Sequence, residues 1–376
     1  MHGAVSITRN LVAIPSVNPM GKNLSGPFYT EGAVAGYIRD FLAALGISAE
    51  LFGEDPERPN LLAYINAGKP TTVLLEAHMD TVSEEHMSIA PFDPVIKNGF
   101  LYGRGSCDTK ASLATYLHVI RTLLQEKKQL AYNVVLAFVK DEEYSFSGAR
   151  ELVAKGVKAD FAIVGEPTEL NLIYAHKGLC RFFIHTEGRS CHSSMPWNGD
   201  NAIYKMAPIL EGIAAYAKSL ESVQHPVLGQ ATISVGRITG GQTVNTVPAS
   251  CSIEIDNRLL PGMTFQTILQ ELLPFLGDPA GYKISAPYLL AMGVDNAPDA
   301  PHCQALMQAC ARAGTRPALQ AAHYATDAAI YQEAGIPCVV FGPGSIAQAH
   351  TADEHIALTQ IEKASDILLQ LLQGEN

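Results

Sequence analysis

Carboxylate and imidazole side chains follow four predicted buried strands, and both residue types are common metal ligands. The strands and the residues after them are 72–77 with His78 and Asp80, 134–140 with Asp141, Glu142 and Glu143, 161–165 with Glu166, and 338–344 with His350 after a short loop. Adjacent carboxylates repel one another, and removing them from water costs free energy unless a cation lies among them. The carboxylates could bind a metal ion, or they could stay exposed to water in a solvated turn.

These residues are expected to meet at one edge of a sheet. In open α/β sheets, ligands bind beyond the carboxyl ends of the strands, and parallel strands bring these ends together. Asp108, in the Gly-rich segment "YGRGSCDTK" before a predicted helix, could join them. Taken singly, each residue has a simpler interpretation: a solvated turn for a Glu, a structural role for a His, and a helix N-cap for Asp108.

The combined set of His, Asp, Glu, Glu and His suits a pair of metal ions. Carboxylates neutralise a dication, and imidazole favours zinc or cobalt over magnesium. Five ligands are too many for one tetrahedral zinc ion but suit two ions that share a bridging carboxylate. Two ions about 3.5–4 Å apart can hold a water molecule and a polarised carbonyl oxygen. Asp80, two residues after His78, would point to the same face of a continuing strand and could fix the imidazole tautomer.

The elements that position these residues alternate between helices and buried strands in two parts of the chain. The residues at 31–46, 112–128, 301–314 and 358–374 have patterns typical of helices. Continuous apolar strands separated by helices predict an α/β fold with a mainly parallel sheet flanked by helices.

Half-alternating strands, typical of an antiparallel sheet, occupy the middle of the chain. These strands are 178–188, 230–241 and 250–262. A helix at 201–220 lies between the first two. We therefore expect an inserted α+β domain over 177–292 and a discontinuous metal-binding domain made of 1–176 and 293–376. One continuous mixed sheet is the alternative.

Composition narrows the class of protein. The chain has 376 residues, of which 47% are hydrophobic, so it can bury a large core and form two domains. A net charge of −11 and the lack of a Lys/Arg cluster argue against nucleic-acid binding. No apolar run approaches the roughly 20 residues of a membrane helix, and no secretory signal is evident, so we expect a cytoplasmic protein. Seven scattered Cys without C-x-x-C predict reduced thiols.

Five segments, in order along the chain, resemble the motifs of the M20 family of metallohydrolases. The segments are "HMDTV", "YGRGSCDTK", "DEEYSFSGA", "GEPT" and "AHTADE". The family includes acetylornithine deacetylases, succinyl-diaminopimelate desuccinylases, aminoacylases and some carboxypeptidases. The resemblance extends over nearly the whole chain and implies a zinc-peptidase-like catalytic domain with an inserted lid and dimerisation domain.

The resemblance implies two divalent metal ions, with Zn²⁺ as the first choice and Co²⁺ or Mn²⁺ as alternatives. His78 and Glu166 would hold one ion, Glu143 and His350 would hold the other, and Asp108 would bridge both.

The implied reaction is amide hydrolysis by an activated water molecule. Glu142 would take a proton from this water and pass it to the leaving amine. Asp80 would orient His78, and Asp141 would be a supporting or solvated residue.

Residues of the inserted domain would complete the site in this family. His192, in "GRSCHSSMP", would stabilise the oxyanion, often across a dimer interface, although a surface His in a Ser-rich turn is the alternative. Asn245 would contact the substrate. Arg258 would pair with a substrate carboxylate unless it forms an interdomain salt bridge. Thr326, in "HYATDAAIY", is a further candidate for substrate contact.

The loop after Asp108 departs from the family pattern. Thr109, Ala111 and Ser112 replace a Met and two glycines, while Lys110 is retained, so we expect an altered helix start rather than a lost site.

"FGPGSIAQAHTADE" and "IDNRLLPGMT" look most similar to the acetylornithine deacetylase branch. The expected partner is therefore a small N-acyl amino acid or short peptide, acted on by a homodimer. The alternatives are a di- or tripeptidase or carboxypeptidase, a desuccinylase, and a catalytically silent binding relative. A nucleotide-binding protein is less well supported, because "GRGSCDTK" lacks phosphate-loop spacing.

Overall fold

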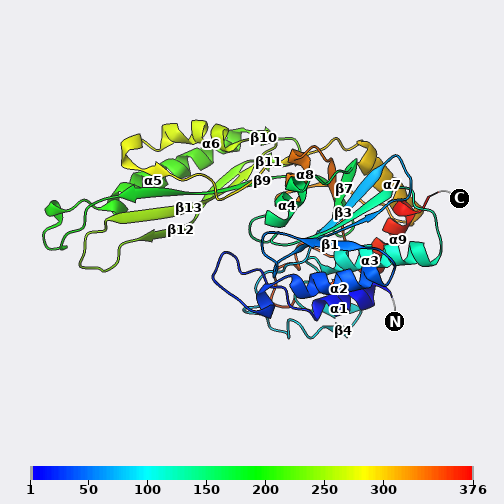
Figure 1. The fold of residues 1–376 in the computed structure, drawn as a ribbon. Helices are drawn as coiled ribbons and strands as arrows, with labels where there is room; N and C mark the ends of the chain where they lie inside the picture. Colours follow the sequence, from blue (N-terminus) through cyan, green and yellow to red (C-terminus); the bar gives the residue numbers. More distant parts are fainter. Residues whose placement is uncertain (1–2, 375–376) are drawn as a thin grey trace. The chain divides into compact units, whose positions relative to one another are not determined.

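The computed structural model describes residues 3–374, which divide into two compact units. The first unit contains the chain up to Tyr174, Asn296–Gln320 and the chain from Thr326 onwards. The second contains Ala175–Asp295 and the short segment Ala321–Ala325. The long antiparallel strands of the second unit form a sheet of their own instead of extending the first sheet (Figure 1).

The first unit is organised around a sheet in the order β1-β2-β6-β3-β7-β18-β8. Its strands are β1 (Ala49–Phe52), β2 (Asn60–Ile65), β3 (Thr72–His78), β6 (Asn133–Val139), β7 (Phe161–Val164), β8 (Leu172–His176) and β18 (Cys338–Val340). The strands β6, β3, β7 and β18 pair in parallel, whereas β1, β2 and β8 run antiparallel to their neighbours. The short strands β16 (Val294–Asp295) and β17 (Leu319–Ala322) pair with β8.

Helices flank this sheet on both faces, as the alternating pattern predicts (Figure 1). They are α1 (Ala4–Val12), α2 (Gly32–Ala43), α3 (Lys110–Gln125), α4 (Ser147–Ala154), α7 (Pro301–Arg312), α8 (Ala328–Glu333) and α9 (Leu358–Leu372). The helices α1, α3 and α9 pack together, and α4 packs on α8. In α3, Leu113, Leu117 and Ile120 recur at helical spacing and are fully or almost fully buried. The helix begins at Lys110, directly after Thr109, which is one of the residues that depart from the family pattern.

A small sheet joins distant parts of the first unit. It has the order β19-β5-β4, with β4 (Val95–Lys97), β5 (Phe100–Tyr102) and β19 (His355–Ala357). Pairing of β19 with β5 is antiparallel and brings the chain after His350 beside the chain before Asp108.

The second unit contains an antiparallel sheet in the order β12-β13-β9-β14, with β15 also pairing with β9. Its elements are β9 (Gly178–Glu187), β12 (Thr232–Gly240), β13 (Ser250–Leu259), β14 (Lys283–Ile284), β15 (Leu289–Ala291), the hairpin β10 (Gln224–His225) and β11 (Gly229–Gln230), and the helices α5 (Ala202–Ser219) and α6 (Phe265–Leu272). Burial alternates along β13, and α5 and α6 lie over one face of the sheet (Figure 1).

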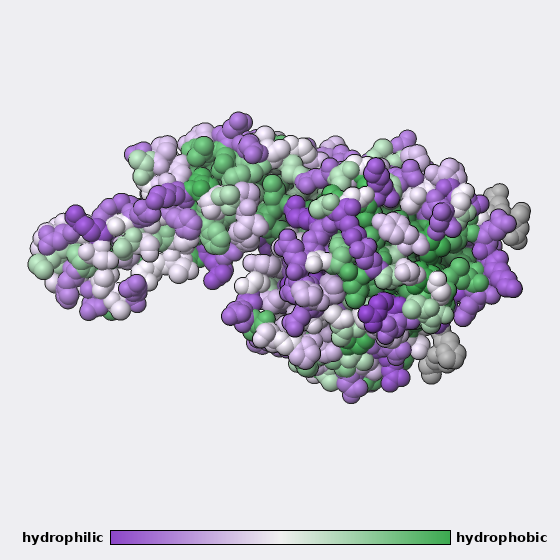
Figure 2. All heavy atoms as spheres, in the orientation of Figure 1, coloured by the Kyte–Doolittle hydropathy of each residue, from purple (hydrophilic) through white to green (hydrophobic). Residues whose placement is uncertain are grey.

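Hydrophilic side chains are spread over the visible face of both units, and hydrophobic ones are interspersed among them (Figure 2). Among residues 3–374, no helix combines the length and the apolar character that crossing a bilayer requires.

Candidate metal centre

His78 ends β3 with its two ring nitrogens facing different groups. Nδ1 lies 2.9 Å from the backbone oxygen of Asp80 and 3.6 Å from the Asp80 carboxylate. Nε2 lies 3.1 Å from Oδ1 of Asp108 and 3.7 Å from Oε1 of Glu166. The side chain is only 1% exposed. Contact of Nδ1 with an oxygen acceptor favours the tautomer whose Nε2 is free to bind a metal ion.

His350 approaches the same acidic cluster from the loop between β18 and β19. Its Nε2 lies 3.1 Å from Oε2 of Glu143 and 3.3 Å from Oδ2 of Asp108. Asp108 therefore presents Oδ1 to His78 and Oδ2 to His350. A carboxylate with one oxygen directed at each imidazole is arranged as a bridging ligand would be.

Two overlapping sets of donor atoms are close enough to hold metal ions. They are His78 with Glu142 and Glu166, and His78 with Asp108 and Glu143, and the donor atoms within each set lie within 4.8 Å of one another. Four carboxylates crowd around the buried imidazole of His78 and the half-exposed imidazole of His350, and such crowding is costly unless cations neutralise the acids. The donor set fits two divalent ions of the zinc type, because it combines imidazole nitrogen with carboxylate oxygen.

The shifted pKa values in this cluster have identifiable causes. Burial raises the pKa of Glu142 and Glu166 well above the usual range, and charges on neighbouring carboxylates contribute. Hydrogen bonds with Asp108 and Glu143 raise the pKa of His350 to about 10. Burial alone would lower the pKa of His78, but the Glu166 charge and the hydrogen bond with Asp108 raise it. Each shift reflects negative charge concentrated in a poorly solvated space.

Asp80 is hydrogen-bonded to the turn that carries two of the other acids. Its oxygens accept hydrogen bonds from the backbone N–H groups of Glu142 and Glu143, both at 3.2 Å. Oδ2 also accepts a 2.7 Å bond from the amide of Asn18. Asp80 therefore contacts His78 on one side and fixes the backbone of the acidic turn on the other.

Asp141 is a buried anchor of this turn and not a solvated acid. It is 5% exposed and adopts a left-handed φ of 62°. Its carboxylate accepts hydrogen bonds from Asn18 at 2.9 Å, Arg58 at 3.3 Å, Ser147 at 2.8 Å, and the hydroxyl of Ser145. Sequence reasoning left the role of Asp141 open and missed Asn18, which lies in the segment "LVAIPSVNP" near the start of the chain.

The Gly-rich loop before Asp108 binds a carboxylate of its own chain. The backbone N–H groups of Gly105, Cys107 and Asp108 donate hydrogen bonds to Glu354 at 2.8–3.0 Å. A phosphate loop would offer such amides to a nucleotide. Because Glu354 occupies them, the nucleotide-binding interpretation of this loop has no structural support.

A second acidic pair lies near His78. Glu76, two residues earlier on β3, and Asp327, directly before α8, are each 1% exposed. Burial raises the pKa of Asp327 to about 7 and that of Glu76 well above its usual range. A Glu in the otherwise apolar strand "TVLLEA" was a signal for this pair, but sequence reasoning gave it no role.

Thr326 lies beside this pair and is 2% exposed. Its hydroxyl accepts a 3.2 Å hydrogen bond from the backbone N–H of Ala328 at the start of α8. In the described structure Thr326 therefore helps to begin this helix.

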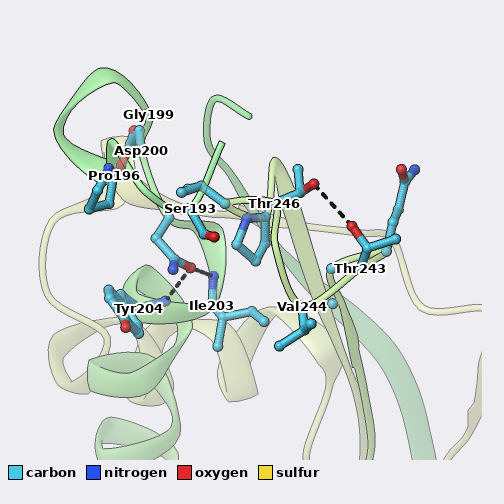
Figure 3. A pocket seen from close by; sticks show the side chains of 15 residues that line it. Ser193, Pro196, Gly199, Asp200, Ile203, Tyr204, Thr243, Val244 and Thr246 are labelled. Carbon is cyan, nitrogen blue, oxygen red and sulfur yellow. Dashed lines mark hydrogen bonds between the residues drawn. The ribbon is translucent and has the colours of Figure 1, made fainter. Parts of the chain in front are cut away.

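His192 and Asn245 lie on two neighbouring loops of the second unit. His192 forms an isolated β-bridge with Thr246, and the N–H of Ser193 donates to the backbone oxygen of Asn245 at 3.0 Å. These loops border a hollow of about 780 Å³. Tyr204, Val244 and Thr246 are among the residues that line it (Figure 3). The His192 side chain is exposed, and its Nδ1 lies 2.7 Å from the hydroxyl of Ser194.

Arg258 lies near the C-terminal end of β13 and forms an ion pair within the second unit. Its guanidinium donates to Asp256 at 2.7 Å, and Asp256 also pairs with Arg181 at 2.9 Å. The register pairs Arg258 with Thr232, whereas Cys251 pairs with Gly240 next to the loop that carries Asn245. At about 3.3 Å per residue, roughly 20–25 Å separate these two ends of the strand.

A family model described as peptidase family M20/M25/M40 matches residues 74–374. The chain belongs to this family. It is a metal-dependent hydrolase of the M20 type, and its fold is the M20 fold of a mixed α/β sheet flanked by helices. The match contains all five residues expected to bind metal.

Three known proteins illustrate what this M20 chain is similar to. The acetylornithine deacetylase of Proteus mirabilis is 32% identical and covers 98% of this chain and 96% of its own. An M20 family metallo-carboxypeptidase of Sulfolobus solfataricus has a TM-score of 0.80 at 20% identity, covering 99% and 98% of the two chains. A Bacillus subtilis protein described as a dinuclear metal-binding peptidase of the M20 family has a TM-score of 0.72 at 18% identity, covering 98% and 96%.

Proposed function

We propose that the protein hydrolyses the amide bond of an N-acyl amino acid, with N-acetylornithine as the first candidate. The observation that carries this proposal is the position of Asp108 between His78 and His350, within a largely buried group of carboxylates. The 32% identity to an acetylornithine deacetylase supports the choice of substrate. The solved structure described as dinuclear supports two metal ions.

Two divalent ions would be held by the cluster, with Zn²⁺ as the first choice and Co²⁺ or Mn²⁺ as alternatives. His78 and Glu166 would bind one ion, Glu143 and His350 the other, and Asp108 both. When bound, such ions polarise an amide carbonyl and make a water molecule more acidic.

Glu142 would move the proton in this reaction. Its carboxylate lies within 4.8 Å of ligand atoms of His78 and Glu166, close enough to reach a water molecule in their midst. Burial and the neighbouring Glu166 raise its pKa, which suits a group that must first accept a proton and then donate it. The two hydrogen bonds from the acidic turn to Asp80 would hold Glu142 in place.

His192 and Asn245 would act on the substrate of a second copy of the chain. Within one copy, Arg258 lies near one end of β13, and the loop that carries Asn245 and bridges His192 joins the other end, roughly 20–25 Å along the strand. We infer that this is too far for all three to touch one small substrate. We propose that Arg258 serves the site of its own chain and that His192 and Asn245 serve the partner's, in a homodimer formed through the second unit. Exposed apolar residues near the His192 loop, including Trp197, which is 74% exposed, support an interface there.

Arg258 would then bind the substrate carboxylate by giving up part of its ion pair with Asp256. Thr326 would line the pocket. Cytoplasmic amino-acid metabolism, including arginine biosynthesis, is the proposed setting.

A di- or tripeptidase or carboxypeptidase is the second candidate, because the solved structures with the same fold include a carboxypeptidase. A desuccinylase keeps the same mechanism with a longer acyl group. A silent relative is disfavoured because every proposed ligand and Glu142 are present.

The deciding experiment is amine release from N-acetyl, N-formyl and N-succinyl amino acids and from dipeptides. Metal-free protein would be assayed alone and with added zinc, cobalt or manganese. We expect metal-dependent hydrolysis with N-acetylornithine above the rest. Preference for a dipeptide or a succinyl compound would keep the mechanism and change the substrate. No turnover from folded protein with both metal sites filled would contradict the proposed function for these substrates.

A further inference from the structure

Glu354 is a buried carboxylate next to the metal centre that accepts four hydrogen bonds, although it is not among the proposed ligands. It is 0% exposed. Oε2 accepts hydrogen bonds from Arg104 Nη1 at 2.8 Å and from Gly105 N–H at 3.0 Å. Oε1 accepts from Cys107 N–H at 2.8 Å and from Asp108 N–H at 3.0 Å. Each oxygen thus receives two donors from the loop that ends in the bridging carboxylate.

Further contacts tie the segment that carries Glu354 to the same loop. The N–H of Gly103 donates to the backbone oxygen of Glu354 at 3.0 Å, and β19 pairs with β5. The Cys107 thiol donates to the backbone oxygen of Ser345 at 3.3 Å. His350 lies four residues before Glu354. One carboxylate therefore connects the loop of Asp108 to the segment of His350.

The two metal positions depend on this connection to different degrees. His78 ends a central strand and Glu166 follows the neighbouring strand, so the sheet itself sets their spacing. The contact between Asp108 and His350 joins two loops instead. Its geometry depends on what fixes one loop against the other.

We propose that Glu354 is a positioning residue that sets Asp108 against His350. It thereby determines the affinity of the second metal position, which is the one that Glu143 and His350 would hold. This inference rests on the proposed dinuclear function. A charged acceptor suits the task, because charge-assisted hydrogen bonds are shorter and stronger than neutral ones and fix several backbone N–H groups at once. An amide in its place keeps the shape but turns an NH₂ group towards two of the donors.

The test is a metal titration of Glu354→Gln in the full chain. Metal-free protein would be titrated with Co²⁺ while its visible absorption and chelator competition are followed. We expect the wild type to bind two equivalents. In the variant, the first should bind nearly as before and the dissociation constant of the second should rise about 10- to 100-fold, as for other residues that orient metal ligands. Circular dichroism and thermal unfolding of the metal-free protein would show that the variant is folded.

Two further variants sharpen the test. Asp353→Asn removes the adjacent exposed carboxylate and should leave both equivalents unchanged. Glu354→Asp keeps the charge but draws it back by one methylene, and it should again weaken the second equivalent selectively; it replaces the Gln variant if that protein does not fold.

The outcomes separate the two proposals. A wild type that binds two ions together with a folded Glu354 variant that binds both equally well would overturn the positioning role alone. Equal weakening of both equivalents would also overturn it, because a general structural defect would have that effect. A wild type that binds fewer than two ions would contradict the dinuclear function, and the positioning role with it.

Discussion

At the scale of single residues, the candidate metal centre concentrates negative charge in a small volume. Glu142 and Glu166 lie close together in a poorly solvated space, and burial raises the pKa of each. Hydrogen bonds from the surrounding structure hold Asp80 and Asp141 in place. The carboxylates left for metal and proton chemistry are thus separate from those that anchor the backbone.

Glu142→Gln should retain both metal ions and lose turnover by about 10²- to 10⁴-fold, because it removes proton transfer while keeping the size of the side chain. Turnover on the best substrate and metal content per chain would be measured together. The control is Glu333→Gln, at the exposed end of α8, which should behave as wild type. Normal turnover by Glu142→Gln would rule out the assignment of this residue as the base.

At the scale of elements, the site forms because strand ends are held in register and because helices start close behind them. The acidic turn lies between β6 and α4, and α4 begins with Ser147 and Gly148. A Cβ atom on Gly148 would lie 2.3 Å from the backbone oxygen of Lys140 and 2.7 Å from the Asn60 side chain. Only a glycine allows this helix to pack so closely on the end of β6.

Gly148→Ala should therefore destabilise the protein by about 1–3 kcal/mol through overpacking. Activity should fall as well, because the turn that carries Glu142 must shift. Gly36→Ala is the matched control, since Gly36 lies inside α2 with nothing within 4 Å of its added Cβ. That change should stabilise the protein by about 0.5–1 kcal/mol. Denaturant midpoints and activities of both variants would be compared, and a stable, active Gly148→Ala would contradict the packing argument.

At the scale of the whole molecule, the chain forms two compact units with different sheets. The first contains all the proposed metal ligands, and the second contains His192, Asn245 and Arg258. Arg258 lies near one end of β13, and the loop that carries Asn245 joins the other end, roughly 20–25 Å along the strand. Under the proposed function, one active site therefore combines residues from two copies.

Mixing two inactive variants tests this arrangement. His192→Ala and Glu142→Gln should each be inactive, but a dimer with one copy of each contains one composite site with both residues intact. After subunit exchange at equal amounts, about a quarter of wild-type activity should return, because half of the dimers are mixed and each restores one of two sites. Sedimentation would establish the dimer. A monomer, or no recovery despite confirmed exchange, would contradict action across the interface.

Much of the fold followed from the sequence because its pattern is local. Apolar runs predicted β3, β6, β7 and β18, and half-alternation predicted β9, β12 and β13. The short strands β4, β5 and β19 were not predicted, since three residues carry too little periodicity to be recognised. Their pairing depends on contacts between residues about 250 positions apart, such as the hydrogen bond from Arg104 to Glu354.

The sequence by itself determined that carboxylates and imidazoles follow buried strands, because the hydrophobic pattern marks each strand end. It also determined the M20 family through five ordered motifs. Only the tertiary structure decided that Asp108 faces both His78 and His350 and that Asn18 and Glu354 hold the loops of the centre. It also decided that His192 bridges the loop that joins one end of β13, whereas Arg258 lies near the other end of that strand. These facts are distances between residues far apart in the chain, and they are set by strand register and loop packing, which no local pattern of residues contains.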